Sequence, residues 1–165
     1  MRIALGLALA FTATAAIAAT DPRTVPTQLP PAWQAKTRAV FKQAIEIPSV
    51  HNRGQVPAVA KLLADQFRAA GIPDSDIHFM PYEALPGDQT EALIVRWRSP
   101  HATKKPILVL GHMDVVEAKR SDWTFDPFVF REQDGYFLGR GSSDMKNGDV
   151  ATTMAAVKLM GEGFK

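Results

Sequence analysis

The chain has 165 residues, of which 46% are hydrophobic and 8% aromatic, a composition typical of a globular protein with one core. It carries 19 Lys and Arg against 17 Asp and Glu, and because these charges are scattered without basic runs, we expect no nucleic-acid partner. It has no cysteine, which excludes disulfides and thiolate metal ligands. Any bound metal must therefore be held by His, Asp or Glu.

Residues 1–19 have the pattern of a signal peptide. Arg2 supplies a short positive start, Ile3–Phe11 is unbroken apolar sequence, and Ala16-Ile17-Ala18 offers small residues for cleavage. The apolar stretch is shorter than the ~20 residues that a membrane span needs. We therefore expect a periplasmic or secreted protein without stable membrane association after cleavage. The alternative is a retained anchor that keeps this segment in the membrane.

Elements of the predicted fold follow in order. Residues 20–32 are a proline-rich linker, and residues 33–165 form one domain. Helical periodicity predicts helices over 33–45, 57–70 and 148–160, the last with Asn147 as N-cap and Gly161 at its end. Strands are predicted over 77–82, 92–97, 107–110, 128–132 and 136–138, the last two joined by an Asp-Gly turn. The apolar run 107–110 is typical of a strand buried on both faces. We predict an α/β fold with a mixed sheet flanked by helices.

Three polar residues follow predicted strands and could form part of a metal site. His112 comes directly after the 107–110 run, and on an extended backbone Asp114 points to the same side. Neutral imidazole is a good zinc ligand, and a nearby carboxylate can fix its tautomer. Asp144 follows two glycines and can hold one metal on each oxygen. Taken singly, His112 could be a polar residue at a loop start and Asp144 a helix cap.

Several motifs in one order resemble those of the co-catalytic zinc exopeptidases, which include carboxypeptidase G, aminoacylase, acetylornithine deacetylase and succinyl-diaminopimelate desuccinylase. The resemblance covers residues 33–165, which it implies are part of a metallopeptidase catalytic domain. The matching segments are Glu46-Ile47-Pro48-Ser49-Val50, Gly111-His112-Met113-Asp114-Val115-Val116, Trp123 with Asp126-Pro127-Phe128, Asp134-Gly135-Tyr136, and Gly139 to Gly148.

The resemblance implies a role for each candidate residue. His112 would bind one zinc, Asp114 would act in catalysis by orienting His112, and Asp144 would bridge two zincs, with a cis peptide between Asp144 and Met145. Cobalt or manganese would also suit nitrogen and oxygen ligands. The implied activity is that of an exported metallopeptidase or amidohydrolase that cleaves a peptide or an N-acyl amino acid next to a free carboxylate.

Other parts expected from the family are absent from the chain. The family's general-base glutamate, its remaining metal ligands and its lid domain, which often forms a homodimer interface, have no counterpart here. We therefore expect an N-terminal fragment that is inactive alone. The alternative is a non-catalytic exported binding domain. At the position where the family commonly has proline the chain has Glu117, either a surface loop residue or a substrate-facing acid.

Overall fold

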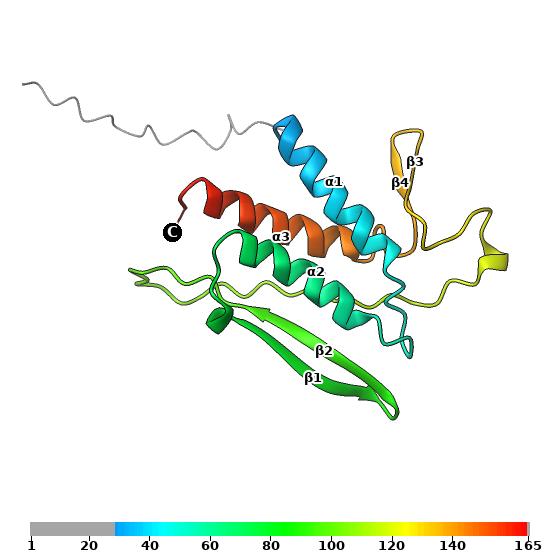
Figure 1. Ribbon diagram of the computed structural model, residues 1–165, viewed down its shortest axis with the longest axis horizontal. Helices are drawn as coiled ribbons and strands as arrows, with labels where there is room; N and C mark the ends of the chain where they lie inside the picture. The colour runs from blue at the N-terminus through cyan, green and yellow to red at the C-terminus, as the bar shows by residue number, and fades with distance from the viewer. Residues whose placement is uncertain (1–28, 165) are drawn as a thin grey trace, which may run out of the picture.

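The computed structural model describes residues 29–164, so the predicted signal peptide and most of the predicted linker lie outside the described residues. Three α-helices, two short 3-10 helices (Asp74–Asp76 and Arg120–Asp122) and two hairpins make up this part of the chain (Figure 1). In chain order the α-helices and strands are α1 (Pro31–Glu46), α2 (Val56–Ala69), β1 (Ile77–Leu85), β2 (Asp88–Val95), β3 (Arg131–Gln133), β4 (Tyr136–Leu138) and α3 (Lys146–Gly161). The α/β class is confirmed, and the three predicted helices are present, α1 and α3 each beginning two residues earlier than predicted.

The core lies where the three helices meet. α1 and α2 both pack on α3, and α2 also packs on β2 (Figure 1). Each helix buries one face, as the apolar periodicity predicted. The main buried cluster consists of Val40, Phe41, Ala44, Ile45, Val59, Leu63, Val150 and Met154.

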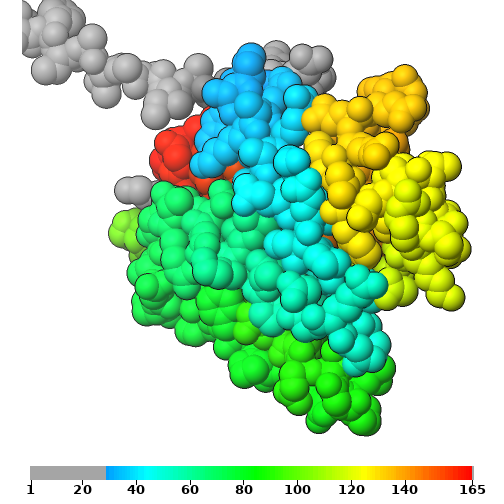
Figure 2. All heavy atoms as spheres, turned by 45° about the vertical axis from the view of Figure 1, so that its right-hand side comes forward, coloured from blue at the N-terminus to red at the C-terminus, as the bar shows by residue number. Residues whose placement is uncertain are grey.

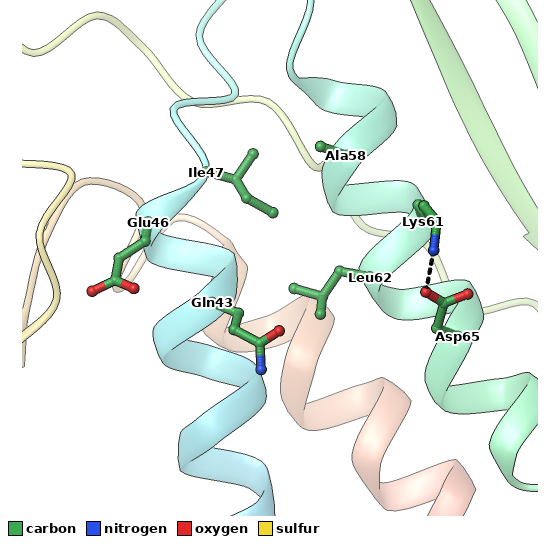
Figure 3. Close-up of a pocket in the computed structure, with 7 residues that line it drawn as sticks. All are labelled: Gln43, Glu46, Ile47, Ala58, Lys61, Leu62 and Asp65. Carbon is green, nitrogen blue, oxygen red and sulfur yellow. Dashed lines mark hydrogen bonds and ion pairs between the residues drawn. The ribbon is translucent and has the colours of Figure 1, made fainter.

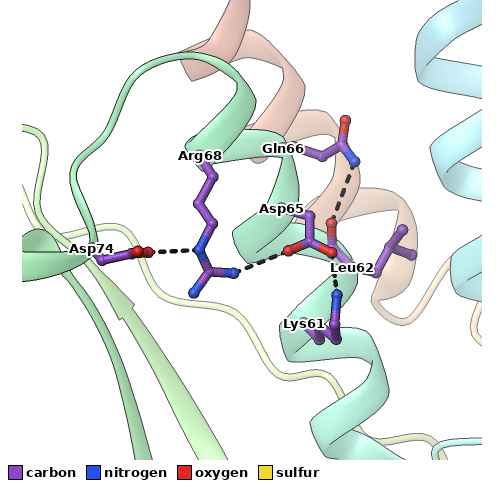
Figure 4. Close-up of polar contacts among 6 residues, drawn as sticks. All are labelled: Lys61, Leu62, Asp65, Gln66, Arg68 and Asp74. Atoms are coloured by element: carbon purple, nitrogen blue, oxygen red, sulfur yellow. Dashed lines mark hydrogen bonds and ion pairs between the residues drawn. The ribbon is translucent and has the colours of Figure 1, made fainter.

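A long antiparallel hairpin covers the other side of α2. β1 pairs with β2 from Ile77 opposite Val95 to the turn at Gly87, and Ile77 packs with Ala64 of α2. On the surface, the Arg68 guanidinium donates to Asp65 at 3.0 Å and to Asp74 at 2.7 Å, while Lys61 donates to the other oxygen of Asp65 (Figure 4). These ion pairs connect α2 to the turn that precedes β1.

The second hairpin, β3–β4, projects from the body of the molecule (Figure 1). Asp134 and Gly135 both have positive φ, 53° and 81°, which is the backbone that an Asp-Gly hairpin turn requires. The turn prediction is therefore confirmed. The first strand, predicted over 128–132, instead spans Arg131–Gln133.

The predicted buried strand at 107–110 is wrong for this structure. The segment is extended but has no strand partner among residues 29–164, and its side chains are 91% (Ile107), 79% (Leu108), 63% (Val109) and 78% (Leu110) exposed. The predicted mixed sheet is likewise absent from the described part, which has two separate antiparallel hairpins and one isolated parallel bridge, Val50 to Val115. An apolar run becomes a buried strand only where neighbouring strands and helices cover it.

Figure 2 shows how the segment after β2 lies relative to the helices. Its yellow and orange parts lie on one side of α1, and α2 with the β1–β2 hairpin lies on the other.

Within the described residues, none of the helices combines the length and the apolar character needed to cross a membrane.

Candidate metal site at the 111–116 and 139–146 loops

The structure brings His112, Asp114 and Asp144 together. Nδ1 of His112 lies 3.1 Å from the backbone oxygen of Asp114 and 3.3 Å from its Oδ1. Nε2 of His112 lies 3.1 Å from Oδ1 of Asp144, although the two residues are 32 positions apart. All three side chains are open to solvent. The predicted proximity is therefore observed, while the roles in metal binding and catalysis stay predictions.

The contacts of the imidazole favour one tautomer. The backbone oxygen of Asp114 can only accept, so Nδ1 carries the proton and donates. In the neutral ring, Nε2 then presents a lone pair to a carboxylate oxygen of Asp144. Two acceptors at this distance repel each other unless a cation, either a proton or a metal ion, lies between them.

The pKa of His112 reflects this arrangement. Desolvation acts to lower the pKa, but the hydrogen bond with Asp144 and the backbone bond and charge of Asp114 outweigh it, so the pKa of His112 is raised above its ordinary value. The two acids therefore favour a positive charge at this position. Within residues 29–164, however, no cluster of three or more His, Asp or Glu side chains is placed to hold a metal ion.

The donor set fits part of a zinc site. Nε2 of His112 and Oδ1 of Asp144 face each other. Asp114 contacts the opposite ring nitrogen, Nδ1, as a supporting carboxylate does in metal sites. A catalytic zinc usually has about three protein ligands and one water. His112 and Asp144 can supply two of these three.

Glycines allow the 139–146 loop to pack closely against its neighbours. Gly139 and Gly141 have φ of 153° and 85°. A Cβ at Gly139 would approach Ile45 to 2.5 Å, and one at Gly141 would approach Val115 to 2.7 Å. Larger residues would push this loop away from α1 and from the 111–116 loop.

The start of α3 differs from the prediction. The helix begins at Lys146 with Met145 as its N-cap residue, and no side chain caps it, so Asn147 is not the N-cap. The peptide between Asp144 and Met145 is cis, as the resemblance implied. Asn147 lies inside the first turn because α3 begins one residue earlier, at Lys146.

Asp149 is a polar residue of this region that the sequence reasoning missed. It lies in the first turn of α3, and burial raises its pKa from 3.8 to about 6, against the lowering effect of His112 and Lys146. Its Oδ2 is buried without a hydrogen-bond partner within the described part of the chain. Its position five residues after Asp144 was visible in the sequence, but its burial depends on contacts with the 111–116 loop.

Glu117 is exposed, and Nη2 of Arg53 donates to both of its carboxylate oxygens, at 2.7 Å and 2.8 Å. The bond from the Ala118 amide, and then that from Arg53, lower the pKa of Glu117. Both residues line a surface hollow of about 420 Å³ with Lys119, Arg120, Asp126 and Phe128. The surface-loop interpretation of Glu117 matches its exposure; the substrate-facing interpretation stays a prediction.

A second hollow, of about 380 Å³, lies between α1 and α2 (Figure 3). It is lined by Gln43, Glu46, Ile47, Ala58, Lys61, Leu62 and Asp65, and Lys61 is bound to Asp65 rather than directed into the space. None of the three candidate site residues lines it. The chemistry of the metal site is therefore separate from this hollow.

Comparisons with known proteins agree with the site's motifs. The model of peptidase family M20/M25/M40 matches residues 108–165, which include His112, Asp114 and Asp144. Aminoacylase-1 of Sus scrofa is 30% identical over 125 residues, covering 75% of this chain and 29% of that protein. A probable succinyl-diaminopimelate desuccinylase of Staphylococcus epidermidis is 48% identical over 56 residues, covering 33% of this chain and 14% of that protein.

Two solved structures share the fold. Human carnosine dipeptidase 1 superposes with a TM-score of 0.65 at 24% identity, over 81% of this chain and 30% of the other. The dipeptidase Dug1p of Saccharomyces cerevisiae superposes with a TM-score of 0.62 at 25% identity, over 77% of this chain and 30% of the other. The chain thus spans less than a third of the length of these relatives. By its motifs, its fold and these similarities, the chain resembles one part of the proteins of peptidase family M20/M25/M40, whose model matches residues 108–165.

Proposed function

We propose that this chain contributes to an exported, zinc-dependent hydrolase that cleaves a peptide or an N-acyl amino acid next to a free carboxylate. The observation that carries the proposal is the placement of His112 Nε2 opposite Asp144 Oδ1, with Nδ1 held by Asp114. The names of the relatives, aminoacylase, desuccinylase and dipeptidase, support amide hydrolysis as the reaction class.

The residues of this chain have distinct tasks in the proposal. His112 and Asp144 would hold zinc, with cobalt and manganese as alternatives, and the second oxygen of Asp144 would be free for a second ion. Asp114 fixes the tautomer and orientation of His112. The metal, when bound, would act as a Lewis acid toward the carbonyl group of the substrate and toward a water molecule.

Zinc binding and hydrolysis test this function. We would measure zinc content and turnover of a panel of dipeptides and N-acetyl amino acids, on the purified 165-residue chain and on the product of any longer reading frame. In the product of a longer reading frame, His112→Ala and Asp144→Ala should each remove nearly all zinc-dependent activity. The matched controls are His101→Ala and Asp122→Ala, which change the same residue types outside the site. More than about a tenth of the rate in either site variant would disprove the site assignment.

A non-catalytic binding domain is the second candidate, because residues 29–164 place only His112 and Asp144 as facing ligands. It predicts zinc-independent binding of peptides without turnover in every length of the product. The expectation that the chain is a fragment is tested by the DNA that follows codon 165, where a continued reading frame with a glutamate pair would support it.

Export and dimerisation are separate parts of the proposal. We expect the mature protein in the periplasm or the medium, with an N-terminus near residue 20, since the first residues have the pattern of a signal peptide. Mass spectrometry of the mature protein tests this, and an intact Met1 would contradict it. A homodimer through a lid domain stays a prediction, which sedimentation of the product of a longer reading frame tests.

A further inference from the structure

Lys146 is a lysine in an unusual place. It is completely buried, and its Nζ donates to the backbone oxygens of Ala44 at 2.7 Å and Ile47 at 2.6 Å. Lysine is almost never fully buried unless its amine is satisfied by partners. Here both partners belong to the end of α1, and Lys146 itself is two residues from Asp144. The amine therefore connects α1 to the loop that carries Asp144.

Ser49 makes the corresponding contact with the other loop. It is also completely buried, and its Oγ donates to the backbone oxygen of Met113 at 2.7 Å, between His112 and Asp114. The Val115 amide donates to the backbone oxygen of Ser49 at 3.0 Å, which forms the parallel bridge next to it. Residues 44–50, here called the 44–50 segment, are thus bonded to both loops of the site.

We propose that Lys146 and Ser49 are positioning residues, through which the 44–50 segment sets the separation of His112 from Asp144. The inference rests on the proposed function, since the separation matters only if the two residues share a metal. Hydrogen bonds are directional, and both donors are fixed by burial, so each loop has one position that satisfies its bond. An apolar side chain in place of Lys146 or Ser49 could fill the same space. It would make no hydrogen bond, so it could not fix where the loop lies.

Gly141 adds to the fit around the lysine. A Cβ at this position would come within 3.2 Å of Cδ of Lys146 and 2.7 Å of Val115, so the glycine lets the loop close over the lysine stem and against the other loop. The alkyl stem of Lys146, its amine, and the close backbone contact at Gly141 thus all restrict where the 139–146 loop can lie. Supporting contacts of this kind typically change metal affinity by about 10- to 100-fold when removed.

A chemical rescue experiment separates the amine from the stem, because the chain has no cysteine. Lys146→Cys would be alkylated in denaturant and refolded. Alkylation with 2-bromoethylamine restores an amine at the lysine position, and 1-bromopropane gives a neutral stem of the same length. The readouts are zinc affinity by calorimetry, amide hydrogen exchange in the metal-free chain, and the free energy of unfolding in urea.

We expect the amine form to match the unsubstituted chain within about threefold in zinc affinity and in amide exchange rates. The propyl form should bind zinc about 10- to 100-fold more weakly, and the amides of Lys146 and Asp149 should exchange at least about tenfold faster while those of β1 and β2 do not change. Equal zinc affinity and equal exchange in the two forms would overturn the inference. So would a purely structural result, in which the propyl form loses unfolding free energy but keeps zinc affinity.

Failure of the proposed function can be told apart from failure of this inference. If the unsubstituted 165-residue chain binds no zinc, the exchange rates of the metal-free chain decide the inference, and zinc content and turnover of the product of a longer reading frame decide the proposed function. If the propyl form does not refold, Ser49→Ala replaces it, with Ser121→Ala as the matched exposed control. Faster exchange at Val115 and weaker zinc binding, where zinc is bound, are expected for Ser49→Ala, and unchanged values would contradict the role of the 44–50 segment.

Discussion

Gly111 and Asp149 lie directly against each other, so that a Cβ on Gly111 would overlap Oδ1 of Asp149. Gly111 immediately precedes His112, and Asp149 is in the first turn of α3. The contact therefore joins the two halves of the candidate site at a point where only a hydrogen fits. The nearest atom belongs to a side chain, so the steric conflict can be removed by a second substitution.

We predict that Gly111→Ala lowers the free energy of unfolding by about 1–3 kcal/mol, because it overpacks a close contact. In an Asp149→Ala background the same substitution should cost less than about 0.5 kcal/mol. Urea unfolding of the four chains measures the coupling. Gly161→Ala is the control, since a Cβ there meets nothing within 4 Å. A cost for Gly111→Ala that Asp149→Ala does not reduce would contradict the contact.

The raised pKa of Asp149 predicts a pH dependence of stability. Burial raises its pKa from 3.8 to about 6 in the folded chain, so the folded state binds more protons between these values. The contribution of Asp149 to stability is therefore fully present below about pH 3.8 and is lost as the pH rises through about 6. The difference between the two pKa values corresponds to about 3 kcal/mol. Because the carboxylate is partly exposed, we expect about 1–2 kcal/mol.

Asp149→Asn tests this dependence. Between pH 4 and pH 7 the free energy of unfolding of the unsubstituted chain should fall by about 1–2 kcal/mol relative to that of the variant, since the amide of Asn does not titrate. Comparing the two pH values cancels any constant cost of the amide itself. Parallel stability curves for the two chains would show that the folded state does not shift the pKa of Asp149.

The acids around His112 predict the order of effects on its titration. Asp144→Asn should lower the pKa of His112 most, because the hydrogen bond with Asp144 is the largest of the effects that raise it. Asp114→Asn should lower it less, since the backbone oxygen of Asp114 remains in place. The protonated ring stabilises the fold at low pH, and this contribution is lost as the pH rises through the raised pKa. NMR titration of the metal-free chain measures each value, and a reversed order would contradict the geometry.

Two isoleucines provide a matched test of the core. Ile45 is fully buried in α1, whereas Ile107 is 91% exposed. Ile45→Ala should cost about 2–5 kcal/mol of unfolding free energy, and Ile107→Ala should change it by less than about 0.5 kcal/mol. Urea unfolding of both variants of the 165-residue chain gives the comparison. A large cost at Ile107 would show that the 107–110 segment is covered in solution.

Local sequence signals predicted the helices and the β3–β4 turn well. The apolar stripe of α2 and the Asp134-Gly135 pair each act within a few residues, so the chain itself contains the information. His112, Asp114 and Asp144 could also be selected, because each follows a predicted strand or a glycine-containing turn.

Features that depend on distant contacts were not predictable. The 107–110 run has the composition of a buried strand, but burial depends on neighbours that residues 29–164 do not provide. The burial of Asp149 depends on the 111–116 loop, and the contacts of Lys146 involve residues about a hundred positions earlier. The same limit applies to the start of α3, which follows the backbone of the loop rather than a capping side chain.

The lysine amine at the end of α1 also affects how that helix is stabilised. The last turn of α1 has no basic residue of its own, so nothing within the helix compensates the negative end of its dipole. The positive charge comes instead from Lys146, at the first residue of α3. A free peptide of residues 31–46 lacks this charge, and short isolated helices are marginal in water. A lysine at the start of α3 thus supplies the positive charge that the carboxyl end of α1 lacks.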